Sequence, residues 1–152
     1  HWSEKRLIEI FEQYGEESSG LARKHAREIV YNRPWKTTKE LAEALSPKGW
    51  YGKHPATKVF QAIRIAVNEE LTLIEKTLPL IPKLLKPNGR IAIITFHSLE
   101  DRLVKQYFKE VSSLGKESEL EILNKTPIVA GMDELVINPR ARSAKLRAAR
   151  KI

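Results

Sequence analysis

The chain has 152 residues, enough for one domain with an apolar core. It contains no cysteine, which excludes a disulfide framework and a thiolate metal site. The absence of cysteine also indicates a cytoplasmic location. Prolines and lysines interrupt the most apolar region before it reaches the roughly 20 residues of a membrane span, so no membrane partner is expected. The formal net charge of +8 favours a polyanionic partner, nucleic acid first, although a merely basic soluble protein explains the charge alone equally well.

The first third of the chain has the periodicity of short helices. It opens without an initiator methionine or a leader segment, which predicts a processed or cut chain rather than a secreted one. Apolar residues at helical spacing predict one helix over residues 3–14 and a second, with a basic face, over residues 21–31. Thr37 and Glu40 have capping-box spacing and predict a third helix over residues 38–45.

The remainder of the chain reads as helix, strand and helix. After a loop over residues 47–55, apolar positions at spacings of three and four predict one long helix over residues 60–78. Residues 90–96 are almost continuously apolar, which predicts a strand covered on both faces, and a helix follows it. Two later stretches, residues 120–124 and 144–152, are expected to pair as antiparallel strands.

The junction between the apolar strand and the next helix is the strongest candidate site. In open α/β sheets ligands bind beyond the carboxyl ends of strands, and a helix N-terminus offers free amides and a positive dipole. His97, Ser98 and Asp101 lie at this edge. The competing interpretation is that Ser98 and Asp101 only cap the helix; the pattern favours it for these two and leaves His97 open.

Polar residues on the long helix form a second candidate surface. Gln61, Arg64 and Asn68 share one helical face and could bind RNA, although a solvated face is the more common reason for such a pattern. Lys53 and His54 at the head of this helix are similarly ambiguous.

A basic loop near the C-terminus is a stronger candidate for phosphate contacts. Asn138, Arg140 and Arg142 surround a proline, which stiffens a loop that presents two guanidinium groups. Guanidinium groups match phosphate with bidentate hydrogen bonds. The alternative is a basic tail with no fixed partner.

No motif indicates a metal or a bound nucleotide. The histidines are far apart and lack partners at ligand spacing, so no metal is expected. A glycine-rich turn from strand to helix is also missing, so the sequence shows no recognisable cradle for a nucleotide or for S-adenosylmethionine.

Three stretches together resemble one known family: HPATKVFQAIRIAVNEEL at residues 54–71, ITFHSLEDR at 94–102 and NPRARSAKLR at 138–147. They are similar to the bacterial 16S rRNA (cytosine-N4) methyltransferases, which modify a decoding-centre cytidine. The resemblance covers essentially the whole chain and corresponds to the C-terminal half of that family.

The resemblance implies an α/β fold: the C-terminal part of a Rossmann-like S-adenosylmethionine methyltransferase sheet with a helical insertion domain. Residues 1–55 would form the insertion, used in substrate recognition, and residues 56–152 would belong to the methyltransferase domain. The family's glycine turn, ribose-binding acid and Asp-Leu-Gly segment would lie before residue 1. S-adenosylmethionine is therefore the expected cofactor of the complete enzyme, and none is expected to bind this chain alone.

The resemblance also implies roles for individual residues. The amine of a splayed cytosine would attack the sulfonium methyl in line, so this half would mainly hold the acceptor. His97 and Asp101 are the expected catalytic residues. The expected RNA-binding residues are Lys53, His54, Gln61, Arg64, Asn68, Ser98, Arg102, Asn138, Arg140 and Arg142.

The expected partner is 16S rRNA or the small ribosomal subunit, together with either a missing N-terminal half or a second copy of the chain. A function of another class stays open, namely a catalytically inactive RNA-binding or assembly fragment. An unpaired sheet edge in a half-sheet would favour association in either case.

Overall fold

The helical first part of the chain forms a compact unit of its own. The computed structural model describes residues 1–46 and 54–152, and it divides into two compact units, His1–Glu70 and Leu71–Ile152. The helices of the first unit are α1 (Glu4–Gly15), α2 (Ser19–Tyr31), α3 (Thr38–Ala44) and α4 (Ala56–Asn68). The predicted caps are confirmed: the Ser3 hydroxyl accepts a hydrogen bond from the Arg6 amide at 3.2 Å, and the Thr37 hydroxyl accepts one from Glu40 at 3.1 Å.

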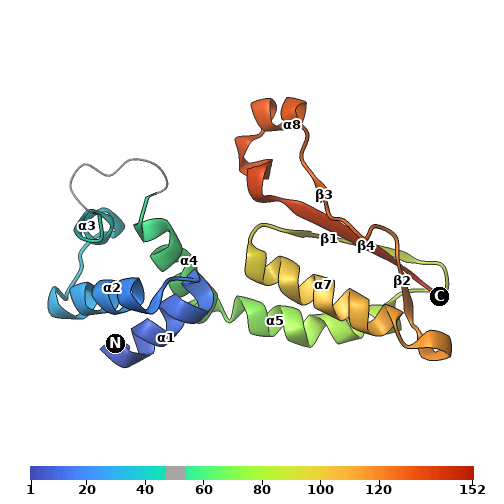
Figure 1. Ribbon diagram of the computed structural model, residues 1–152, viewed down its shortest axis with the longest axis horizontal. Coiled ribbons are helices and arrows are strands. Elements are labelled where there is room, and N and C mark those ends of the chain that lie inside the picture. Colours follow the sequence, from blue (N-terminus) through green and yellow to red (C-terminus); the bar gives the residue numbers. More distant parts are fainter. Residues whose placement is uncertain (47–53) are drawn as a thin grey trace. The chain divides into compact units, whose positions relative to one another are not determined.

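Helix α1 packs against both α2 and α4, which encloses the core of this unit (Figure 1). From α4 the core takes Ala56, Val59, Ala62 and Ile65, each at most 1% exposed. The turn between α1 and α2 is fixed from inside by a buried pair, in which His25 Nδ1 lies 3.0 Å from a Glu17 carboxylate oxygen.

The second unit combines helices with a small antiparallel sheet. Its α-helices are α5 (Glu70–Thr77), α6 (Ile81–Leu84), α7 (Ser98–Ser112) and α8 (Met132–Ile137). Its short 3-10 helices are η1 (Leu78–Leu80), η2 (Gly115–Glu117) and η3 (Pro139–Ser143). The first residue of α5 belongs to the first unit. Its strands are β1 (Arg90–Thr95), β2 (Leu120–Ile122), β3 (Ile128–Val129) and β4 (Lys145–Lys151). The expected α/β class is therefore confirmed.

Strand β4 is the centre of this sheet. It pairs antiparallel with β1, with β2 and with β3, and the β1 register runs from Arg90 opposite Arg150 to Thr95 opposite Lys145. The predicted pairing of the two C-terminal stretches is thus confirmed. Helix α7 packs on the sheet, and its Val104, Phe108 and Val111 join a core that includes Leu120 and Ala149.

Two predictions about these elements are wrong. The apolar stripe over residues 60–78 does not form one helix, because Glu69 adopts a left-handed conformation (φ 53°) that separates α4 from α5. Strand β1 is not covered on both faces among the described residues: Ile91 and Ile93 are half-buried, whereas Ile94 is 55% exposed.

The compact units divide after Glu70, whereas the boundary read from the sequence lies after residue 55. Helix α4 explains the difference, since it packs on α1 and so completes the core of the first unit. Much of the predicted loop over residues 47–55 lies outside the described residues. Among the helices that the structure describes, none combines the length and the apolar character needed to cross a bilayer.

Candidate functional site

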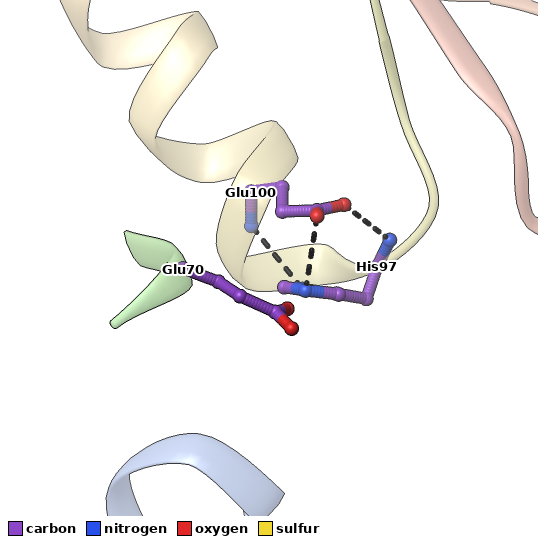
Figure 2. A group of neighbouring side chains, drawn as sticks. All are labelled: Glu70, His97 and Glu100. Atoms are coloured by element: carbon purple, nitrogen blue, oxygen red, sulfur yellow. Dashed lines mark hydrogen bonds and ion pairs between the residues drawn. The ribbon is translucent and has the colours of Figure 1, made fainter. Parts of the chain in front are cut away.

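The candidate site lies where β1 passes into α7. His97 is the N-cap of α7, and its ring Nδ1 accepts a hydrogen bond from the Glu100 amide at 3.3 Å. The Glu100 carboxylate reaches back and accepts a hydrogen bond from the His97 amide at 3.3 Å (Figure 2). It also accepts one from the Phe96 amide at 2.8 Å. This reciprocal capping box fixes the turn at the carboxyl end of the strand. The N-cap of α7 is therefore His97, one residue before the Ser98 that the sequence pattern favoured as the cap.

The capping geometry determines where His97 carries its proton. A ring nitrogen that accepts a hydrogen bond has no hydrogen of its own, so the neutral imidazole is protonated at Nε2. Nε2 lies 3.3 Å from Glu100 Oε1, and only 9% of the His97 side chain is exposed (Figure 2). Glu100 was not among the predicted site residues, although its spacing from His97 is the local signal that could have found it.

Asp101 is bound by basic residues of β4. Its carboxylate accepts two hydrogen bonds from Arg147, at 2.7 and 3.2 Å, and lies 3.4 Å from Lys145 Nζ. Asp101 is 8% exposed and Arg147 6% exposed. The Arg147 guanidinium holds the pKa of Asp101 below its ordinary value of 3.8, so the carboxyl is ionised at neutral pH. A carboxylate of low pKa is a weak base and has no proton to donate.

The basic loop near the C-terminus lies at the same edge of the sheet. Element η3 carries Arg140 and Arg142, both exposed, and it leads directly into β4, whose Lys145 pairs with Thr95 at the end of β1. Among the ion pairs of the described residues, none involves either arginine. Asn138 is exposed just before η3, and the first turn of α7 contributes the exposed Ser98 and Arg102. The structure thus gathers these predicted residues around one strand end.

Other predicted RNA-binding residues belong to the first unit. Arg64 donates two hydrogen bonds to the Glu70 carboxylate, at 2.9 and 3.1 Å, and the Asn68 amide donates a third at 3.0 Å. His54 lies at the start of α4, with its Nε2 2.9 Å from the Ser46 hydroxyl. Gln61 is partly buried on α4, and Lys53 lies outside the described residues. Glu70, which accepts hydrogen bonds from both Arg64 and Asn68, was not among the predicted site residues.

The described residues of this chain do not fit S-adenosylmethionine by themselves. The groove beside the end of β1, about 420 Å³, is lined mainly by aliphatic side chains, including Leu73, Ile74 and Ile93, with Glu100 as its acid. Gly89 precedes β1, and a side chain there would meet the Lys86 carbonyl at 2.8 Å, so this glycine serves a tight turn. Strand β3 leads through Ala130 and Gly131 into α8, but this connection holds a single glycine and not the G-x-G-x-x-G turn that cradles the cofactor in Rossmann-like sheets.

Comparison with known proteins identifies the family. Residues 1–152 match the model of the MraW methylase family. Proteins named ribosomal RNA small subunit methyltransferase H are similar to the whole chain: that of Synechocystis sp. is 52% identical (100% of this chain, 49% of that protein) and that of Nostoc sp. 54% (99% and 49%). The chain spans about half the length of the curated relatives it matches. The chain belongs to the MraW methylase family.

Proposed function

We propose that this chain is part of an S-adenosylmethionine-dependent methyltransferase that acts on the N4 amine of a cytidine in 16S rRNA. The chain supplies recognition of the RNA and one side of the active site. The reaction takes place in the cytoplasm on 16S rRNA or the small ribosomal subunit. Within the chain, residues 1–55 act as the helical insertion that recognises the substrate, and residues 56–152 act as part of the methyltransferase domain.

One observation carries the proposal: the end of β1 gathers both kinds of group that an RNA-modifying site needs. His97 lies there in a turn fixed by Glu100, and the exposed Arg140 and Arg142 reach the same edge through the pairing of β1 with β4. Exposed guanidinium groups can contact a phosphate backbone, and the capped turn at His97 lies at the same strand end, where a base would be held. This side of the site holds the acceptor nucleotide.

The uncovered part of β1 supports a partner that completes the sheet. Ile94 is 55% exposed, and the apolar groove beside β1 has Leu73 and Ile93 among its lining residues. Apolar surface of this kind favours a covering partner. Because the curated relatives are about twice as long as the chain, we assign the covering residues and the cofactor site to a missing N-terminal half. A second copy of the chain is the alternative occupant.

Methyl transfer measured with and without that half tests the proposal. Small ribosomal subunits lacking the modification are incubated with labelled S-adenosylmethionine and this chain, alone or mixed with the N-terminal half of a curated relative. We expect N4-methylcytidine, identified by mass spectrometry of the digested RNA, only in the mixture. Label at another RNA position would contradict the assigned substrate.

The competing function is that of a catalytically inactive RNA-binding or assembly fragment, which the self-contained core of each unit favours. Such a fragment binds RNA but stays inactive in the mixture, even when the two halves form a stable complex. The same experiment therefore separates the two functions.

A further inference from the structure

Phe96 is an exposed aromatic side chain on a fixed turn. It is 56% exposed, whereas Phe11 and Phe108 are at most 2% exposed, and its neighbour Thr95 is buried. The Phe96 amide donates to the Glu100 carboxylate at 2.8 Å, which holds the main chain in place. Leaving a ring of this size in water forgoes the free energy of burying it. A packing role within the described residues therefore does not account for Phe96.

The end of the sheet at which Phe96 lies carries cations in addition to the Glu100 carboxylate that binds the Phe96 amide. It directly follows Thr95, whose hydroxyl donates to the Lys145 carbonyl at 3.4 Å and whose register partner is Lys145. Paired residues of antiparallel strands are about 5 Å apart, so η3, which ends just before Lys145, lies at the same edge. The exposed Arg140 and Arg142 are on η3. An exposed ring and several cations thus share one end of the sheet.

We infer that Phe96 is a stacking platform for an unpaired base of the bound RNA. Proteins that bind single-stranded nucleic acid combine aromatic side chains, on which bases stack, with cations that contact the phosphates. The inference rests on the proposed function and adds a positioning residue that the sequence motifs did not single out. Stacking accepts any base, so Phe96 contributes affinity and orientation, and base identity is selected elsewhere.

Alanine replacement tests the stacking. Binding of the full chain to a short single-stranded RNA is measured by fluorescence anisotropy for the wild type, Phe96→Ala, Phe96→Tyr and Leu114→Ala. Leu114 is a matched control, because it is 49% exposed and follows the opposite end of α7. We expect Phe96→Ala to weaken binding about fivefold or more, and Phe96→Tyr to stay within about twofold of the wild type. Leu114→Ala should bind as the wild type does.

Salt and abasic RNA separate stacking from charge. Stacking releases no counterions, so Phe96→Ala should lower affinity without changing the salt slope, whereas Arg140→Ala should reduce the slope by about 1. An oligonucleotide with abasic positions should weaken wild-type binding but not that of Phe96→Ala. Equal affinities of Phe96→Ala and the wild type would overturn the stacking role and leave the proposed function intact. A wild-type chain that binds no RNA would overturn both.

Discussion

At the scale of single residues, Asp101 and Arg147 form an ion pair that links α7 to β4. Both side chains are buried, and the two hydrogen bonds between them are 2.7 and 3.2 Å long. Asp101→Asn leaves the Arg147 charge buried without its counterion, which should lower the free energy of unfolding by about 3–5 kcal/mol. Urea denaturation followed by circular dichroism measures this loss. Asp133→Asn, at an exposed acid of α8, is the control and should change stability little.

The same pair makes stability depend on pH in a defined direction. The pKa of Asp101 is lowered in the folded protein, mainly by its hydrogen bond to Arg147, so the unfolded chain binds the proton more tightly. The stabilisation is therefore fully present above the ordinary value of 3.8 and is lost as the pH falls through the lower pKa of the folded state. Unfolding curves between neutral and acidic pH should show this loss in the wild type. An identical acid dependence in Asp101→Asn would rule out this origin.

His97 combines a capping role with a predicted catalytic one, and two variants separate them. Asparagine is among the best N-cap residues, so His97→Asn should keep the start of α7, whereas His97→Ala should cost about 1 kcal/mol of stability. If the imidazole takes part in methyl transfer, both variants of the reassembled enzyme should lose kcat while RNA affinity changes less. Activity restored by asparagine would show that the cap alone matters.

At the scale of elements, the caps of α1 and α3 and the positions of β1, β2 and β4 were predictable because their signals are local, whereas the cap of α7 falls on His97 and not on the expected Ser98. Ser3, Thr37 and the apolar run of β1 each show their role within a few residues of sequence. The break at Glu69 was not predictable, because a left-handed glutamate has no local signature and the apolar stripe continues past it. The apolar positions of the stripe do not all face the core: Val67 is 62% exposed, whereas Val59 and Ala62 of α4 are fully buried.

Leu73 on α5 tests whether the groove beside β1 is a docking surface for the missing half. It lines that groove and is 55% exposed, so Leu73→Glu should leave the chain folded. A carboxylate placed in an apolar interface costs several kcal/mol, so association with the N-terminal half should weaken about tenfold or more. Leu84→Glu is the matched control, since Leu84 on α6 is 80% exposed and is not among the residues that line the groove. Equal loss in the two variants, measured by sedimentation, would argue against this surface.

At the scale of the whole molecule, the described residues form two cores, one in each compact unit. The sequence predicted a helical part and a sheet part. The division of contacts after Glu70 could not be predicted, because the packing of α4 on α1 depends on contacts between distant residues. The candidate site shows the same limit. His97 and the arginines of η3 could be found from local motifs, whereas Arg147 contacts Asp101 from 46 residues away and had no such signal.

The last prediction is that this chain alone binds S-adenosylmethionine weakly or not at all. Rossmann-like sheets hold the cofactor through a glycine turn after the first strand and an acid about 20 positions later that accepts hydrogen bonds from the ribose. The turn that follows β1 is Phe96-His97-Ser98, and the groove beside it is mainly aliphatic. Such a wall lacks the groups that fix ribose and methionine, so most of the binding energy should be missing.

Isothermal titration of the purified chain measures this directly, and the mixture with the N-terminal half of a relative is the positive control. We expect heat of binding only from the mixture, because the residues that bind the cofactor, supplied by the N-terminal half, and strand β1 of this chain then form one sheet. Groove variant Leu73→Glu should lower the cofactor signal of the mixture in proportion to the complex that is lost. A stoichiometric micromolar isotherm from the chain alone would overturn the prediction and would mean that these residues form a complete cofactor site.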